Sequence, residues 1–342
     1  MPVALLEVRN LRVEFPTRRG ALVAIDDVSF SIEPGEVLGV VGESGAGKSL
    51  TGAAIIGLLE APGRIAAGQI LLSGRRIDNL GNDAMRRVRG KEIGAIFQDP
   101  LTSLNPLYTI GRQLVETIQT HLDLSAAQAQ RRAVDLLEAT GIPGARDRID
   151  HYPHQFSGGM RQRVVIALAL AAEPKLIVAD EPTTALDVSI QAQIIALLKK
   201  LCRDHGTAVM LITHDMGVIA ETADRVAVMY AGRIVEVGRV ADVIHRPQHP
   251  YSAGLMGAIP SMRHDVAALA QIAGAMPRLT AIPSGCTFHP RCRRRFAPCD
   301  TQRPDLMPAG PSRAACWLHD PAWRERAHPA PGEREIDLVD LA

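Results

Sequence analysis

The sequence predicts an α/β fold, in which a mostly parallel β-sheet is covered by helices. Two observations lead to this prediction. In the second half of the chain, short apolar runs of strand length alternate with longer stretches whose apolar residues recur at helical spacing. In the first half, a glycine-rich loop at 42–47 follows a short apolar run and precedes residues that favour a helix. Strand–helix alternation of this kind places strands in a mostly parallel sheet.

The N-terminal region, residues 4–41, is predicted to be β-structure. Val28, Phe30 and Ile32 alternate with serines, as in a strand that is buried on one face. The run 37–41 is apolar throughout, which is typical of a fully buried strand. A hairpin-like stretch is expected next, at 69–77.

The rest of the core is predicted to alternate between helices and strands. A helix begins at Ile110, a second begins after the N-cap Ser125 and ends near Gly141, and a third at 160–172 is stopped by Pro174. Buried strands are expected at 176–179, 208–212 and 225–230, with a helix carrying Ile190, Ile194, Leu197 and Leu201 between the first two.

The composition changes beyond about residue 245. Hydrophobic periodicity fades and prolines recur, at Pro247, Pro250, Pro260, Pro277, Pro283 and Pro290. This pattern predicts a separate, loop-rich C-terminal extension that needs a staple to hold it.

Charge and hydropathy exclude several classes of protein. The chain of 342 residues has a formal net charge of +1, without the basic excess that is typical of nucleic-acid binding. Its longest apolar run, Val164 to Ala172, is far shorter than the ~20 residues of a transmembrane helix. The N-terminus lacks the basic and apolar segments of a secretory leader. A role at a membrane would therefore require docking to other chains.

The glycine-rich loop predicts a polyphosphate site. Its eight residues match the pattern G-x-x-x-x-G-K-[ST] in the expected context between a strand and a helix. Backbone N–H groups of such a loop point inward at the positive end of the following helix. The lysine is expected to reach the β- and γ-phosphates, and the final serine to ligate Mg²⁺. The residues are Gly42, Glu43, Ser44, Gly45, Ala46, Gly47, Lys48 and Ser49.

Two acids end the strand at 176–179 and complete this site. Asp180 and Glu181 follow four apolar residues, at the sheet edge where ligands bind in α/β proteins. We expect Asp180 to hold Mg²⁺ through water. Glu181 is expected to polarise the attacking water, a contribution of about 10²–10⁴-fold for a general base.

Further motifs indicate the family. Residues 156–163, Phe-Ser-Gly-Gly-Met-Arg-Gln-Arg, resemble the signature sequence of ATP-binding cassette (ABC) ATPases. In that family Ser157, Gly158 and Gly159 would form a second phosphate nest at a helix N-terminus, aimed at ATP on a partner subunit. Gln98 resembles the glutamine that contacts the metal and couples to membrane subunits, and His214 resembles the switch histidine. Residues 185–187, Ala-Leu-Asp, resemble the loop that reaches across the dimer, which assigns Asp187 to the nucleotide site.

The resemblance implies the fold class in detail. It implies an ABC-type P-loop ATPase over residues 4–255, with a RecA-like core, an antiparallel β region and a helical subdomain at about 102–165. The C-terminal extension would then cover 256–342. Catalysis would rest on Lys48, Gln98, Glu181 and His214, with ATP and Mg²⁺ as cofactors, and Phe15 lies where the family stacks an aromatic ring on adenine. Phe15 is equally consistent with a strand residue facing the core.

Three stretches resemble the peptide/nickel importer branch, and in particular its D-type ATPase subunit. They are 97–106, 152–157 and 249–252. The resemblance implies a homologous but distinct partner ATPase, two permease subunits, an extracytoplasmic peptide-binding protein, and a place at the cytoplasmic face of the cell membrane. Nickel, glutathione and antimicrobial peptides compete with di- and oligopeptides as the solute. A non-transport ABC ATPase and an iron–sulfur sensing module are the alternatives of other classes.

Four cysteines crowd into the C-terminal extension, while Cys202 lies in an amphipathic helix and is expected to be a buried core thiol. Four soft ligands suit a zinc ion or a four-cysteine iron–sulfur cluster. The spacing lacks the C-x2-C pairs common in zinc knuckles, and 285–292 resembles importer ATPases with a [4Fe–4S] cluster. Unligated or disulfide-forming cysteines remain the third alternative. The four are Cys286, Cys292, Cys299 and Cys316.

Overall fold

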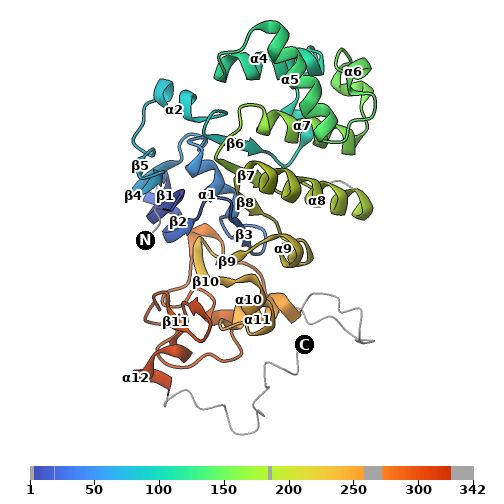
Figure 1. The fold of residues 1–342 in the computed structure, drawn as a ribbon. Coiled ribbons are helices and arrows are strands. Elements are labelled where there is room, and N and C mark those ends of the chain that lie inside the picture. Colours follow the sequence, from blue (N-terminus) through green and yellow to red (C-terminus); the bar gives the residue numbers. More distant parts are fainter. Residues whose placement is uncertain (1–3, 19, 184–186, 258–271, 325–342) are drawn as a thin grey trace.

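The computed structural model describes residues 4–18, 20–183, 187–257 and 272–324. Two sheets form its frame (Figure 1). The smaller sheet is antiparallel, with the order β2-β1-β4-β5, and consists of β1 (Leu6–Thr17), β2 (Gly20–Ile32), β4 (Arg64–Leu72) and β5 (Arg75–Arg76). The predicted N-terminal β region and the hairpin-like stretch are thus confirmed.

The larger sheet has the order β11-β12-β10-β9-β3-β8-β7-β6. Its parallel part runs from β9 to β6, so the carboxyl ends of β3, β8, β7 and β6 lie at one edge. The strands are β3 (Val37–Val41), β6 (Ile93–Ile96), β7 (Leu176–Asp180), β8 (Ala208–Ile212), β9 (Arg225–Tyr230), β10 (Arg233–Arg239), β11 (Met307–Ala309) and β12 (Ser312–Ala314).

Helices cover this sheet and extend one end of the molecule (Figure 1). Around the sheet lie α1 (Lys48–Ile55), α2 (Asn82–Val88), α8 (Val188–His205), α9 (Met216–Thr222), α10 (Val240–His245) and α11 (Pro250–Gly257). The helical end is formed by α3 (Pro100–Ser103), α4 (Ile110–His121), α5 (Ala126–Ala139), α6 (Ala145–Arg148) and α7 (Gly158–Leu170). The last helix described is α12 (Pro321–Arg324).

Local sequence signals explain where the helices begin. Ser125 caps α5 as predicted: its Oγ accepts a hydrogen bond from the Gln128 N–H at 3.4 Å, and the Gln128 side chain accepts one from the Ser125 N–H at 2.9 Å. This reciprocal pair satisfies two donors that the helix itself leaves open.

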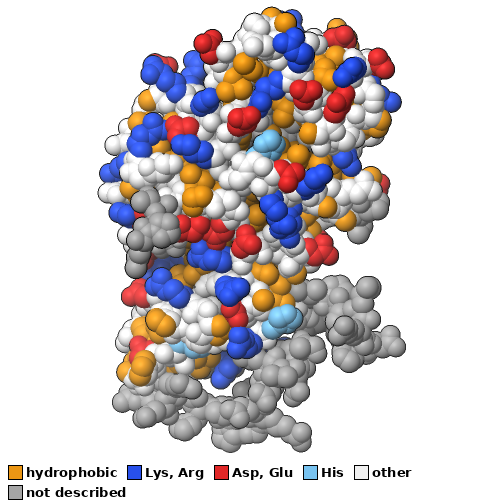
Figure 2. Space-filling model, viewed as in Figure 1, with side chains coloured by type: hydrophobic (Ala, Val, Ile, Leu, Met, Phe, Trp, Pro, Cys, Tyr) orange, Lys and Arg blue, Asp and Glu red, His pale blue; other side chains and the backbone are white. Residues whose placement is uncertain are grey.

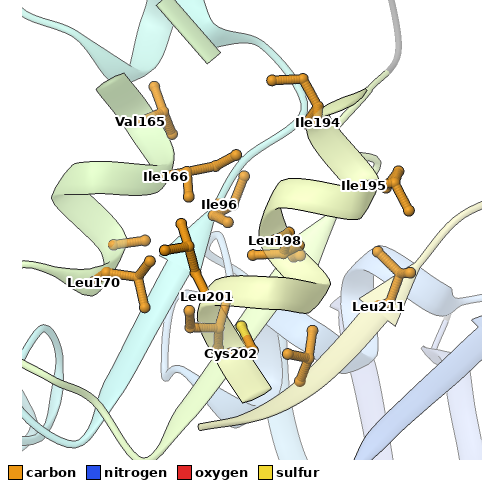
Figure 3. Packing of buried hydrophobic residues seen from close by; sticks show 14 of the residues in the cluster. Ile96, Val165, Ile166, Leu170, Ile194, Ile195, Leu198, Leu201, Cys202 and Leu211 are labelled. Carbon is orange, nitrogen blue, oxygen red and sulfur yellow. The ribbon is translucent and has the colours of Figure 1, made fainter. Parts of the chain in front are cut away.

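The main core lies between α7, α8 and the parallel strands (Figure 3). Ile166 from α7, Leu198 from α8 and Ile96 from β6 are at most 3% exposed there. Cys202 is 1% exposed in the same cluster, which confirms its prediction as a core thiol. Burial raises the pKa of the Cys202 thiol to about 12, so the group stays neutral at physiological pH.

The C-terminal extension is joined to the core sheet, although the sequence predicted a separate region. Strand β12 pairs antiparallel with β10, and β11 pairs with β12. The buried Glu236 carboxylate on β10 accepts hydrogen bonds from the N–H groups of Gln248 and His249 and from the Ser312 hydroxyl. Strands of three residues are too short to show a period of two, which is why the sequence did not reveal them.

Among the described residues, none of the helices is sufficiently long and apolar to cross a lipid bilayer. The face shown in Figure 2 carries basic and acidic side chains interspersed with one another.

Candidate functional site

The phosphate-binding loop joins β3 to α1 and is shaped by its glycines. Gly42 has φ of 150°, and a Cβ there would lie 2.2 Å from the carbonyl oxygen of Met229. Gly47 has φ of 102°, and its Cβ would lie 2.6 Å from Ile25 Cδ1. Because other residues would be strained and would clash, glycine is required at both positions.

Lys48 begins α1 and points back into this loop. Its Nζ donates to the carbonyl oxygens of Gly42 at 2.8 Å and Glu43 at 3.1 Å. The side chain is buried, and burial lowers its pKa despite the nearby carboxylates of Glu181, Asp180 and Glu43. A cation that is poorly solvated in this way gains from an incoming polyphosphate.

Ser49 and Asp180 meet next to the loop. The Ser49 hydroxyl donates to Asp180 Oδ1 at 2.9 Å, which joins the start of α1 to the end of β7. Burial raises the pKa of Asp180, with the neighbouring Glu181 acting in the same direction. A hydroxyl beside a desolvated carboxylate has the oxygen donors that Mg²⁺ prefers, and the cation would stabilise the charged form of Asp180.

The Glu181 side chain lies between those of Gln98 and His214, both of which the sequence predicted as site residues. Its carboxylate accepts from Gln98 Nε2 at 3.1 Å and lies 3.2 Å from His214 Nδ1. Gln98 follows β6, Glu181 follows β7 and His214 follows β8, so three adjacent parallel strands deliver the group to one edge. Glu181 also has φ of 46°, a conformation that is strained for a non-glycine residue and is concentrated at functional sites.

The signature residues form the beginning of helix α7. Ser157 caps α7, and its hydrogen bonds are with Met160 and Arg161 of that helix. The side chain is exposed and therefore accessible to a partner. Gly158 and Gly159 form the first turn of α7.

Asp187 and Phe15 are the two remaining residues that the sequence assigned to the nucleotide site. Asp187 is exposed and immediately precedes α8, while Ala185 and Leu186 of the same motif fall outside the described residues. Phe15 lies on β1, half-buried against the core cluster that the two sheets share, and its ring approaches Gly63.

The four clustered cysteines line one small pocket of the extension, together with aromatic residues such as Phe288 and Trp317. All four thiols are free. Burial raises the pKa of Cys286 and Cys292 to about 11, that of Cys316 to about 12, and that of Cys299 in the same direction. Within the described ranges, no three histidine, cysteine or acidic side chains are arranged to hold a metal ion.

Two residues beyond position 245, Tyr251 just before the extension and Arg291 within it, also reach the phosphate loop, which the sequence did not indicate. Arg291 forms a two-pronged ion pair with Glu43, and Tyr251 Oη accepts from the Glu43 N–H at 2.8 Å. These residues are more than 200 positions apart in the chain, so no local pattern could have predicted the contact.

Comparison with known proteins decides the family. Residues 25–184 match the family "ABC transporter", and residues 235–299 match "Oligopeptide/dipeptide transporter, C-terminal region". The oligopeptide transport ATP-binding protein OppD of Salmonella typhimurium is 49% identical over 88% of this chain and 89% of its own length. The dipeptide transport ATP-binding protein DppD of Bacillus subtilis is 46% identical over 92% and 95%.

The chain belongs to the ABC transporter ATP-binding family. Its predicted fold class is confirmed by solved structures as well. The dimeric, post-hydrolysis structure of the ATP-binding cassette MJ0796 with ADP and Pi has a TM-score of 0.62 and 28% identity, covering 69% of this chain and 98% of that one. This ABC protein is therefore an ATPase, with Gln98, Asp180, Glu181 and His214 at the edge of its parallel sheet.

Proposed function

We propose that this chain is the ATP-hydrolysing subunit of an importer of dipeptides or oligopeptides, acting at the cytoplasmic face of the cell membrane. One observation carries the proposal: an ABC core with an assembled phosphate and carboxylate site is joined to a C-terminal region of the oligopeptide/dipeptide transporter type. The ATPase domain is taken as residues 4–255 and the extension as 256–342.

Residues of the loop would bind Mg-ATP. Backbone N–H groups of the loop other than that of Glu43, together with the N-terminus of α1, would receive the phosphates, and Lys48 would exchange its carbonyl partners for phosphate oxygens. Ser49, Asp180 and Gln98 would hold Mg²⁺ directly or through water. Phe15 would stack on the adenine.

Glu181 is proposed as the residue that polarises the attacking water. It lies beside His214, which would contact the γ-phosphate, and beside Gln98, which would report nucleotide occupancy to the membrane subunits. When Mg²⁺ and ATP bind, the exchange of these side-chain contacts would free the Glu181 carboxylate for the water.

A second ATPase subunit is proposed to complete each site. Ser157, Gly158 and Gly159 lie on a helix N-terminus at the surface, and Asp187 is exposed beside α8, so all four are available to a partner's nucleotide. A homologous but distinct partner chain would give a heterodimer.

Two permease subunits, supplied by an extracytoplasmic peptide-binding protein, are the proposed membrane partners. Large apolar side chains near Gln98 in the sequence support this docking: Phe97, directly before it, is 44% exposed, and Leu101 and Leu107, after it, are 61% and 79% exposed. Apolar side chains left in water at one region commonly mark an interaction surface.

The cysteine pocket is proposed to hold a [4Fe–4S] cluster with a structural role. Four thiols around one pocket have the donor chemistry that such a cluster needs. Zinc is the alternative occupant, because four thiolates suit a tetrahedral zinc site as well. The names of the relatives refer to peptide transport and not to a metal. Iron, sulfide and zinc contents after anaerobic purification, with Cys292→Ser as the variant, test this assignment.

The transport proposal is tested in cells that lack this chain. Uptake of labelled dipeptide, pentapeptide, glutathione and nickel is measured before and after restoring the wild-type chain or Glu181→Gln. Peptide uptake restored only by the wild type is expected. If only nickel or glutathione uptake is restored, that solute takes the place of the peptide in the proposal. If no uptake is restored, a non-transport ATPase or a sensing module is favoured.

A further inference from the structure

Glu43 places a carboxylate inside the phosphate-binding loop, where a polyphosphate is to bind. Its backbone carbonyl accepts from Lys48 Nζ, so the residue belongs to the loop's own hydrogen-bonding system. An acid at this place is unfavourable by itself, because like charges at short range repel in a partly buried site.

Arg291 compensates for this carboxylate from the extension. Its Nη1 donates to Glu43 Oε2 at 2.8 Å and its Nη2 to Glu43 Oε1 at 3.0 Å. The Arg291 side chain is 7% exposed and that of Glu43 29%. Two parallel hydrogen bonds between charged groups fix direction as well as distance.

Arg291 is in turn fixed within the extension. Its Nε donates to the carbonyl oxygen of Ala273 at 2.9 Å, and its Nη2 to those of Ile272 and Gly274 at 3.2 Å and 3.3 Å. A lysine at this position has no planar fork with which to make these contacts together.

Two other side chains of the C-terminal part contact the same loop. The buried Tyr251 hydroxyl accepts from the Glu43 N–H, so that this N–H is directed away from the phosphate cradle. Met276 lies beside Gly45, with its Cγ 3.9 Å from the position of a Cβ there. The extension therefore contacts the loop at two of its residues.

We propose that Arg291 is a positioning residue for nucleotide binding, which neutralises and orients Glu43 so that the loop accepts a polyphosphate. The extension thereby sets the ATP affinity of the core. This inference rests on the ATP site alone, and it stands whichever solute is transported and whichever metal the cysteine pocket holds.

The test is a charge-compensation cycle on the full-length chain. The dissociation constant of a fluorescent ATP analogue with Mg²⁺ is measured for the wild type, Arg291→Gln, Glu43→Gln and the double variant. Arg291→Gln should weaken binding about fivefold or more, within the usual range of coupling between sites. The double variant should return to within about twofold of Glu43→Gln, because removal of the unpaired carboxylate removes the repulsion.

Arg293→Gln is the matched control, since this arginine lies two positions away with an exposed side chain, and it should bind as the wild type does. Thermal unfolding of each variant separates an effect on folding from an effect on ATP affinity. If Arg291→Gln does not fold, Arg291→Lys replaces it and should bind with an affinity between those of the wild type and an uncharged variant. Unchanged affinity in Arg291→Gln, or in Arg291→Lys where that variant replaces it, would overturn the proposal. A double variant that binds the ATP analogue as weakly as Arg291→Gln would also overturn it, because Arg291 would then act on the structure of the extension and not through Glu43.

Discussion

The ATP site and the C-terminal extension belong to the same eight-stranded sheet, but they are held in different ways. At the site, Gln98, Glu181 and His214 lie just beyond the ends of adjacent parallel strands, and Lys48 follows β3 after the phosphate-binding loop, so that strand order brings the four residues to one edge. The extension depends on a few long-range polar contacts, made by Glu236 and Arg291. The regular core thus positions its site residues through the order of its strands. The irregular extension is positioned through charged side chains that are buried and paired.

The largest expected effect concerns the site. Glu181→Gln should lower ATP turnover about 10²–10⁴-fold, because the amide cannot polarise the attacking water. Nucleotide binding should be retained, and the closed pair of ATPase subunits should persist. Steady-state phosphate release and nucleotide binding are the two measurements.

Glu138→Gln, an exposed acid on α5, is the control and should leave both values unchanged. Unaltered turnover in Glu181→Gln would remove the role assigned to this carboxylate.

The second effect concerns the extension. Glu236→Gln should destabilise it by about 1–3 kcal/mol for each backbone N–H left without an acceptor, since the amide carries one acceptor oxygen where the carboxylate has two. Denaturant unfolding and hydrogen exchange of 245–324 measure the loss. An equal loss in Glu138→Gln, or none in Glu236→Gln, would contradict the view that buried charges hold this region.

These two regions also differ in how far the sequence predicted them. Alternation and apolar runs predicted the sheet, Ser125 as an N-cap predicted the start of α5, and the motifs predicted the residues that meet at Glu181. The β10–β12 pairing and the Arg291–Glu43 contact were missed, because a three-residue strand has no period and an ion pair over such a separation has no local signal. Physical chemistry shows that a buried charge needs a partner, but only the fold identifies it.

A smaller effect is a pH dependence of stability from His249. Burial, with His319 adding to it, lowers the pKa of this side chain to about 3 from its ordinary 6.5. The unfolded chain therefore binds a proton that the folded chain excludes. The contribution of His249 to the free energy of unfolding is complete above pH 6.5 and is lost as the pH falls toward 3. The slope is at most about 1.4 kcal/mol per pH unit.

His249→Asn tests this assignment because its side-chain oxygen can replace Nδ1 as acceptor of the Tyr251 N–H. The variant should be less stable at pH 7 but should lose less stability between pH 6.5 and 5. Identical slopes in the two proteins would assign the acid sensitivity to other groups.

The smallest effect separates the core cysteine from the pocket cysteines. Cys202→Ala should lower the unfolding free energy by about 1 kcal/mol through the small cavity it leaves. Metal content and nucleotide affinity should stay as in the wild type, whereas Cys292→Ser should lose bound iron. Loss of iron in Cys202→Ala would place Cys202 in the metal site instead.

The most direct measurement of the central claim is ATP hydrolysis by the complete transporter in liposomes, with this chain, its partner ATPase, the permeases and the peptide-binding protein. The account predicts that an oligopeptide raises the hydrolysis rate several-fold and accumulates inside or outside according to the orientation of the complex, and that both effects vanish with Glu181→Gln. Hydrolysis that is indifferent to peptides, or peptide movement that continues with Glu181→Gln, would contradict it.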